Sequence, residues 1–229
     1  MNRKKLTFLA FFLMIFSFSF AQNANSQEGK KEKKTYVLIE TSYGNMKILL
    51  YNDTPLHKEN FIKLAKKGFF DGLLFHRVIN NFMIQGGDPK SLNAPKGQML
   101  GNGGPGYTIP AEFLPHRFHK KGALAAARQG DAVNPKKESS GSQFYIVQGQ
   151  RFNEQQLKAI AMQYKKTFSP EQIEIYKTIG GTPFLDNDYT VFGEVVEGLD
   201  VIDKIAIVQC DPNNRPIDDV KMKVRVIEE

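Results

Sequence analysis

The sequence has very little cysteine, since Cys210 is the single example in 229 residues. A disulfide needs two cysteines, and the common zinc and redox motifs also need more than one. The chain therefore cannot be held together by internal disulfides, and zinc-finger or dithiol chemistry is excluded. We expect the Cys210 thiol to be buried or unused rather than catalytic.

A strong excess of one charge is also missing from most of the chain, although the formal net charge is +7. Arg3, Lys4 and Lys5 near the N-terminus account for three of these charges and leave +4. Residues 22–34 hold four lysines against two glutamates, so residues 35–229 carry only +2. Because nucleic-acid binding depends on clustered positive charge, we expect no DNA or RNA partner.

Motifs for covalent catalysis and for nucleotide or metal binding are absent as well. The glycines of GNGGPG (101–106) have the spacing of a phosphate-binding loop, but Pro105 cannot open the helix that such a loop requires. His116 and His119 lie in a loop-like stretch without a carboxylate at helical spacing, so we interpret them as structural or solvated. SSGS (139–142) is not a nucleophile elbow, and nothing marks a base for serine catalysis.

The first 21 residues have the pattern of a secretory signal peptide, with basic residues, an apolar run from Leu6 to Phe20 and a small residue, Ala21, at the expected cut site. The alternative is an uncleaved membrane anchor, although the run is shorter than the roughly 20 residues of a spanning helix. A lipid anchor would need a cysteine at the cut site, and the sequence has none there. We expect an exported, periplasmic protein, with secretion or tethering by an uncleaved signal as alternatives.

Residues 22–34 (QNANSQEGKKEKK) are polar and lack apolar periodicity, which predicts a flexible tether. The remaining residues, 35–229, are numerous enough for one well-buried domain. Within it, residues 36–51 are predicted to form a hairpin around a turn at Gly44–Asn45. Further strands are predicted at 123–128, 142–148, 190–196 and 222–228.

Two helices are predicted among these strands. The first has Thr54 as its cap, Pro55 at its first position and Gly68 at its end, with an apolar face of Leu56, Phe61 and Leu64. The second covers residues 198–208. Many short strands with two helices predict a mainly β fold with a closed or nearly closed antiparallel barrel.

Residues 153–181 differ from the rest and predict a helical hairpin set between strands. Ser169, Pro170 and Gln172 have the pattern of a capping box with proline at the first helical position, and Gly180–Gly181 end the second helix. The apolar faces are formed by Leu157, Ile160, Ala161 and Tyr164 in the first helix and by Ile173, Tyr176 and Ile179 in the second.

The segment FHRVINNFMIQGGD (75–88) places the cation of Arg77 and the amide of Gln85 among apolar residues, with no nucleophile nearby. Rotation about an Xaa-Pro amide fits such a site. Its barrier is about 18–20 kcal/mol because the nitrogen lone pair is delocalised. In the twisted transition state the nitrogen becomes a hydrogen-bond acceptor, so a fixed guanidinium binds that state best, without metal, cofactor or covalent intermediate.

Five ordered motifs, FHRVINNFMIQGGD, GGPGYTIPAEF (103–113), ALAAAR (123–128), GSQFYI (141–146) and FLDNDYTVFGEVVEG (184–198), resemble those of the cyclophilin-type peptidyl-prolyl cis-trans isomerases. The resemblance covers nearly all of residues 36–229. It implies a closed eight-stranded antiparallel barrel capped by two helices, with a substrate groove on one outer face that acts on proline-containing polypeptides. We expect a monomer.

The resemblance also implies roles for individual residues. Arg77 corresponds to the family's catalytic arginine and Gln85 to its supporting glutamine. The proline pocket would be lined by Phe82, Met83, Tyr145, Leu185 and Tyr189, and the groove wall that bonds the substrate backbone would consist of Ala127, Arg128 and Gln143.

This chain departs from the family pattern at three positions. Phe184 stands where members that bind cyclosporin strongly have tryptophan, and Tyr145 and Tyr189 stand where phenylalanine and histidine are common. The ring-gripping surface persists, but drug affinity and substrate preference are expected to differ.

Other interpretations remain open. Taken singly, Phe82, Met83 and Tyr145 could be ordinary core residues, although Arg77 would then be an unexplained charge in an apolar stretch. The domain could also be mainly a proline-peptide binder or a holdase-like chaperone, with isomerisation incidental.

Overall fold

The computed structural model describes residues 33–228. The chain divides into two units, Met1–Lys33 and Lys34–Glu229, and only the second is described below. The predicted signal peptide (1–21) and residues 22–32 of the predicted tether lie outside the described residues. None of the helices within residues 33–228 has the length and apolar character needed to cross a membrane.

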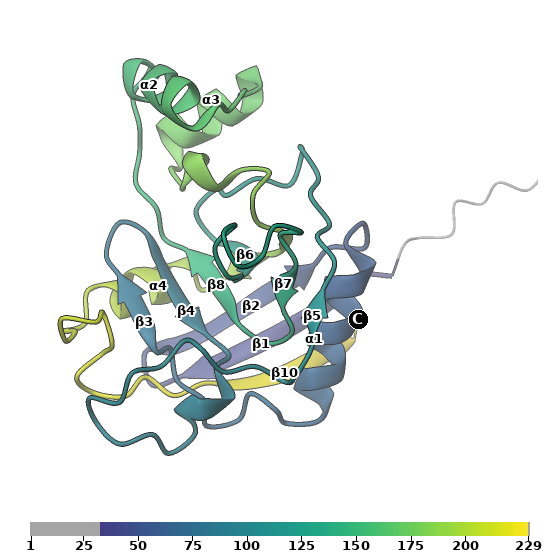
Figure 1. Cartoon of the computed structure of the whole chain (residues 1–229), viewed down its shortest axis with the longest axis vertical. Coiled ribbons are helices and arrows are strands. Elements are labelled where there is room, and N and C mark those ends of the chain that lie inside the picture. Colours follow the sequence, from purple (N-terminus) through teal and green to yellow (C-terminus); the bar gives the residue numbers. More distant parts are fainter. Residues whose placement is uncertain (1–32, 229) are drawn as a thin grey trace, which may run out of the picture. The chain divides into compact units, whose positions relative to one another are not determined.

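Eight strands form one curled antiparallel sheet, a half-barrel with the strand order β10-β1-β2-β9-β6-β8-β4-β3 (Figure 1). Two further strands, β5 (Thr108–Ile109) and β7 (Ser139–Ser140), pair separately. The bounds of the eight strands are β1 Thr35–Thr41, β2 Gly44–Leu50, β3 Arg77–Ile79, β4 Met83–Gly86, β6 Ala123–Ala126, β8 Phe144–Val147, β9 Val191–Glu197 and β10 Lys223–Glu228.

The sheet is open, so the predicted closed barrel is wrong. Within the described residues, β10 pairs only with β1 and β3 only with β4. Between these two edges, residues 72–78 and 214–222 meet through single backbone bonds, such as Phe75 N–H to the Val220 carbonyl at 2.9 Å. Pro216 interrupts the second segment, and proline cannot donate to a strand ladder. Irregular chain rather than paired strands therefore spans the gap.

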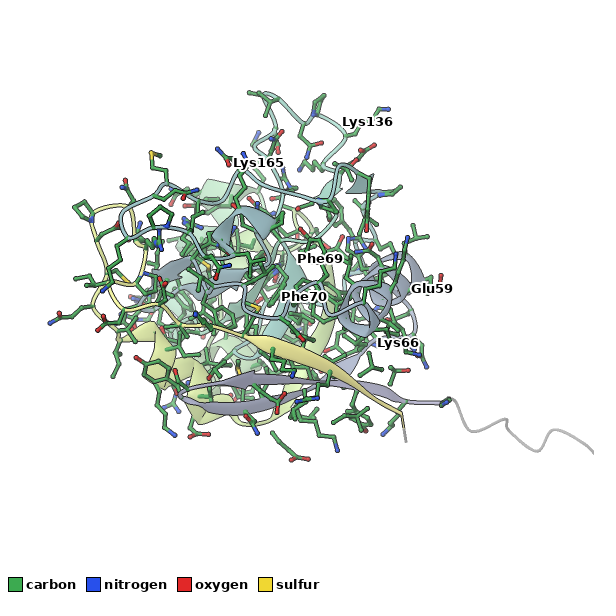
Figure 2. The ribbon with its side chains drawn as sticks, turned by 90° about the horizontal axis from the view of Figure 1, so that it is seen from below. Glu59, Lys66, Phe69, Phe70, Lys136 and Lys165 are labelled. Atoms are coloured by element: carbon green, nitrogen blue, oxygen red, sulfur yellow. The ribbon has the colours of Figure 1, made fainter. Side chains whose placement is uncertain are left out.

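The main core lies between the sheet and two helices, α1 (Pro55–Lys66) and α4 (Leu199–Ala206). Phe61 of α1 and Ile202 of α4 are both buried in the same apolar cluster as residues of the sheet. Figure 2 shows Phe70 among the packed side chains, whereas Glu59 and Lys66 lie on the outer side of α1. Both predicted helices are therefore present, and each covers part of the sheet.

The start of α1 is as predicted, but its cap is not. The Thr54 side chain makes no capping hydrogen bond. Instead, the Glu112 carboxylate accepts the backbone N–H groups of Leu56 and His57, each at 3.0 Å, and lies 2.6 Å from His57 Nδ1. A carboxylate from a distant loop thus satisfies the helix N-terminus and its dipole. Leu56 was predicted to lie on the buried apolar face of this helix but is exposed, and its neighbour His57 is buried instead.

Two more helices, α2 (Glu154–Tyr164) and α3 (Pro170–Thr178), follow β8 and lie side by side beyond the end of the sheet (Figure 1). The predicted capping box of Ser169 and Gln172 is confirmed, and Asn153 and Gln156 form a second one. Each helix therefore carries a local start signal of its own.

A small apolar cluster, separate from the main core, holds α2 and α3. Its buried members are Phe152, Leu157 and Tyr176. Tyr164 and Ile179, which helical spacing placed on the apolar faces, are exposed instead. The helices thus pack through fewer residues than their periodicity predicts.

Candidate active site

Arg77 and Gln85 are direct cross-strand partners in β3 and β4. Because side chains alternate between the two faces of a strand, Val78 and Ile84 are buried in the core and the Arg77–Gln85 pair lies on the other face. The Arg77 Nη1 donates a hydrogen bond to Gln85 Oε1 at 3.1 Å. The hairpin register therefore sets the amide beside the guanidinium.

Gln85 is itself held by a second amide. Its Nε2 donates to Gln143 Oε1 at 3.0 Å, and Gln143 Nε2 donates to the carbonyls of Gly101 and Gly103 at 3.0 and 2.7 Å. The buried Asp88 carboxylate accepts the N–H groups of the same two glycines at 2.5 and 3.2 Å. The guanidinium is thus tied through two amides to the loop 101–106, which contains no helix or strand, as expected.

A pocket of about 280 Å³ opens beside the guanidinium. All of the predicted site residues except Gln143 and Phe184 line it, together with two residues that were not predicted as site residues, Leu100 and Gly101. Phe184, in the short helix η2 (Pro183–Leu185), instead packs against Phe82 with ring centroids 5.7 Å apart and the rings tilted. The complete lining is Arg77, Phe82, Met83, Gln85, Leu100, Gly101, Ala127, Arg128, Tyr145, Leu185 and Tyr189.

The charge of Arg77 has no carboxylate partner within the described residues, where its one hydrogen bond is to Gln85. Its carbon Cζ lies 5.9 Å from the Phe82 ring centroid. Partial burial lowers the pKa of Arg77, which means that its environment penalises the charged form. Several N–H donors of this cation therefore remain available to a ligand.

Arg128, the second cation of the pocket, is used differently. Its Nε donates to the Asp188 carbonyl at 2.7 Å and its Nη1 to Asp131 Oδ1 at 2.6 Å. The guanidinium lies over the Tyr189 ring, 4.5 Å from its centroid. These contacts hold the 184–189 segment in place. The Arg128 donors are therefore used within the protein, whereas most of the Arg77 donors are available to a ligand.

A buried polar chain supports the pocket wall behind Tyr145. The Tyr145 hydroxyl lies 2.9 Å from His119 Nε2, and His119 Nδ1 lies 2.9 Å from Asp186 Oδ1. The other Asp186 oxygen accepts the Tyr176 hydroxyl of α3 at 2.7 Å. Burial raises the pKa of both tyrosines, so their hydroxyls stay protonated donors. His119 was expected to be structural or solvated, and no local pattern placed it behind the pocket.

Gln143 lines a larger cavity of about 690 Å³ next to the pocket, and the two share Gln85, Gly101, Ala127 and Arg128. The Ala127 N–H donates to the Gln143 carbonyl at 3.0 Å, and the Ala127 carbonyl accepts from Ser140 at 2.8 Å. Within residues 33–228, no group of three His, Cys, Asp or Glu side chains is arranged to hold a metal ion.

These features define a class of site in which a guanidinium held by a glutamine faces a small pocket of mixed polar and apolar lining, which has no serine, cysteine, lysine or carboxylate. A family model described as cyclophilin type peptidyl-prolyl cis-trans isomerase matches residues 36–226.

Two relatives carry the provisional name peptidyl-prolyl cis-trans isomerase. One, from Staphylococcus aureus (strain USA300), is 36% identical over 194 residues, which are 84% of this chain and 91% of the relative. The other, from Staphylococcus saprophyticus, is 36% identical over 195 residues with the same shares.

Solved structures show the same fold. The crystal structure of a cyclophilin type peptidyl-prolyl cis-trans isomerase from Cryptosporidium parvum has a TM-score of 0.61 at 23% identity, covering 86% of this chain and 99% of that one. A crystal structure of that protein in the presence of the dipeptide Ala-Pro has a TM-score of 0.59 at 23% identity over 85% and 98% of the chains.

The chain therefore belongs to the cyclophilin-type peptidyl-prolyl cis-trans isomerase family, and the resemblance noted in its sequence is confirmed.

Proposed function

We propose that Arg77 catalyses cis-trans rotation about Xaa-Pro bonds by donating a hydrogen bond to the proline nitrogen in the twisted state. Only in that state does the nitrogen hold a localised lone pair, since the planar amide delocalises it. A donor that binds the twisted form better than either planar form lowers the barrier. No covalent intermediate and no cofactor is part of this mechanism.

The observation that carries this proposal is the contrast between the two cations of the pocket. Arg128 is occupied by a carbonyl, a carboxylate and an aromatic ring, whereas Arg77 is bonded within residues 33–228 only to the Gln85 amide. A guanidinium that is fixed by one hydrogen bond and whose other N–H groups have no partner is preorganised to donate to a ligand acceptor.

The remaining residues would have supporting roles. Phe82, Met83 and Leu185 would hold the proline ring while the other side of the amide turns. Gln85 would fix the direction of the guanidinium, and Gln143 would brace Gln85 and the glycine-rich loop. The groove wall beside Ala127 and Arg128 would contact the substrate backbone.

The test is turnover of a short Xaa-Pro peptide by Arg77→Ala. Loss of one preorganised donor costs about 2.7–4 kcal/mol, so the rate constant should fall on the order of a hundred- to a thousandfold. Arg77→Lys should recover little, because an ammonium on a flexible stem cannot reproduce the planar fork. Phe82→Ala should also raise KM by opening the pocket.

Arg225→Ala, which removes an exposed arginine on β10, is the matched control and should leave turnover unchanged. Circular dichroism establishes that each variant is folded. A folded Arg77→Ala protein that works within twofold of the parent would show that this charge is structural.

A second function, binding of proline-rich segments as a holdase, is supported by the same pocket. Suppression of aggregation of a proline-free client separates the two functions, because an isomerase alone should not protect such a client. Protection without peptide turnover would favour the holdase.

We further propose that the chain is exported and assists the folding of proline-containing polypeptides outside the cytoplasm, and that it works as a monomer. The charged start, the apolar run and the small residues before the expected cut at Ala21 support export. Intact-mass analysis of exported protein should show a chain that begins after Ala21, and a chain retaining Met1 would contradict this.

The α2–α3 hairpin is proposed to be an addition to the isomerase domain. Its apolar cluster is separate from the main core. Loop-closure entropy grows only logarithmically with length, so a domain tolerates such an addition at little cost.

A further inference from the structure

A row of aromatic rings leads from the proposed proline pocket to the end of α2. Phe82, a pocket wall, packs against Phe184 in a tilted arrangement, with ring centroids 5.7 Å apart and an interplanar angle of 33°. Phe184 in turn packs against Tyr164, also tilted, with ring centroids 5.7 Å apart and an angle of 36°. The row thus joins the turn between β3 and β4, where Phe82 lies, with η2 and with the last residue of α2.

The outer end of this row is open to solvent. Tyr164 is 45% exposed, and Phe82 and Phe184 are half-buried. Within the described residues, the Tyr164 hydroxyl makes no hydrogen bond, and Tyr164 is not a member of the apolar cluster that holds α2 against α3. Packing of the hairpin therefore does not require this ring.

The position of Tyr164 relative to the pocket is fixed by the residues that follow it. Lys165 ends α2 in the left-handed conformation with φ of 53°. The Lys166 ammonium, whose side chain is 8% exposed, donates to the Asp186 carbonyl at 2.5 Å and pairs with the Asp188 carboxylate. The end of α2 is thus fastened to the same segment that carries Leu185 and Tyr189 of the pocket lining.

The two cavities place this row on a separate side of the pocket. The larger cavity meets the pocket at Gln85, Gly101, Ala127 and Arg128, and none of the three rings of the row lines this cavity. The row leaves the pocket at Phe82, beside Phe184 and Leu185. A peptide bound at the pocket can therefore pass the larger cavity on one side and the rings on the other.

We infer that Phe184 and Tyr164 form an accessory subsite for an apolar or aromatic side chain two positions from the proline. This inference rests on the proposed binding of proline at the pocket. An extended peptide advances about 3.3 Å per residue and turns alternate side chains to the same face. A side chain two positions away therefore lies roughly one ring-to-ring step from the proline ring, against Phe184 and Tyr164.

Peptides that differ at one position test this subsite. Two series are compared, with phenylalanine or serine placed two positions after the proline in one and two positions before it in the other. In one series the parent should prefer the phenylalanine peptide over the serine peptide. The preference should be a lower KM with kcat unchanged, because the contact between the peptide's phenylalanine and the rings is present equally in the ground and transition states. Tyr164→Ala should reduce this preference by roughly two- to tenfold, the range of an aromatic pair.

The controls separate ring packing from general effects on the hairpin. Tyr164→Phe keeps the ring and should keep the preference. Met162→Ala removes an apolar side chain of α2 that is 83% exposed and outside the row, and it should also keep the preference. Equal preference in Tyr164→Ala and the parent, or no preference for phenylalanine in either series, would overturn the inference.

Direct binding distinguishes this inference from the proposed catalytic mechanism. In Arg77→Ala, calorimetric affinity for the phenylalanine peptide should still fall when Tyr164→Ala is added. If the parent turns over no peptide but binding depends on Tyr164, the catalytic proposal fails and the subsite stands. If turnover occurs but binding is independent of Tyr164, the subsite fails and the catalytic proposal stands.

Discussion

The Tyr145 hydroxyl lies 2.9 Å from His119 Nε2, directly behind the wall of the proposed proline pocket. Both side chains are buried, and their rings stack with an interplanar angle of 13°. A phenylalanine at this position would give the same apolar wall but would leave the histidine without this partner. The hydroxyl therefore supports the structure behind the pocket rather than the pocket surface itself.

We predict that Tyr145→Phe destabilises the protein without a comparable loss of turnover. The variant leaves His119 Nε2 buried without its partner, which costs about 1–3 kcal/mol, whereas the ring still lines the pocket. Urea unfolding measures the first effect and peptide turnover the second. Tyr36→Phe, which also removes a tyrosine hydroxyl but on β1 and away from the pocket, is the control. Parent-like stability of Tyr145→Phe would show that this hydrogen bond contributes little.

Acid should destabilise the protein through His76, which is 4% exposed. Burial is the largest cause that lowers its pKa from 6.5 to about 4, with Arg77 and Arg215 acting in the same direction and Asp88 opposing them. The folded pKa is below the unfolded one, so the unfolded chain takes up the proton first. The stability that neutral His76 contributes is thus fully present above pH 6.5 and is lost as the pH falls towards 4. The total loss is about 3 kcal/mol, at 1.36 kcal/mol per pKa unit.

Unfolding free energies at pH 7, 5.5 and 4.5 check this dependence. The slope between these values should be smaller in His76→Gln than in the parent, whatever the absolute stability of the variant. Burial also lowers the pKa of His57, so some slope should remain. His116→Gln changes a histidine whose side chain is 62% exposed and serves as the control. Equal slopes in His76→Gln and the parent would refute the assignment.

Local signals in the sequence predicted the elements well where one segment contains its own start and stop. The capping box of Ser169 and Gln172 and the proline at the start of α1 are both of this kind. The hairpin turn was predicted at Gly44–Asn45, but these residues lie in β2 and the turn is at 42–43. Gly44 is needed because its φ is +127° and a Cβ there would lie 2.9 Å from Val201 of α4.

Features that depend on distant segments could not be predicted from local pattern. The carboxylate that caps α1 comes from Glu112, far along the chain, and no local signal marks it. The open edge of the sheet depends on how residues 72–78 meet residues 214–222. Most residues of the candidate site were predicted because they follow the family motifs. The role of His119, which lies outside any strand, was missed because its partner Tyr145 lies farther along the chain in β8.

Cyclosporin should bind the protein weakly, because Phe184 has no indole N–H where strongly binding family members have tryptophan. A lost hydrogen bond to a buried acceptor costs about 1–3 kcal/mol. Phe184→Trp should therefore tighten binding by roughly ten- to hundredfold, as measured by calorimetry. Tyr36→Trp adds a tryptophan away from the pocket and should change nothing. Nanomolar binding by the unmodified protein would contradict this prediction.

Replacing residues 153–179 with a short Gly-Ser bridge should leave a folded protein that still turns over a short Xaa-Pro peptide. Gly180 and Gly181 are kept, because Gly181 bridges to Lys120 and Gln150. The replacement removes the Tyr176 hydroxyl from the buried Asp186 carboxylate and the Lys166 ammonium from the Asp186 carbonyl and the Asp188 carboxylate. We expect it to cost about 1–3 kcal/mol of unfolding free energy for each of these two side chains.

The double variant Lys166→Met/Tyr176→Phe in the intact chain removes only these side-chain contacts and is the matched comparison. If the hairpin is an addition to the domain, the two variants should lose similar stability, because the cluster around Leu157 and Tyr176 is separate from the main core. Unfolding curves and peptide turnover of both proteins give the answer. If the bridged protein fails to fold while Lys166→Met/Tyr176→Phe remains stable, the hairpin is part of the structural core, and the main sheet with α1 and α4 does not suffice to hold the pocket.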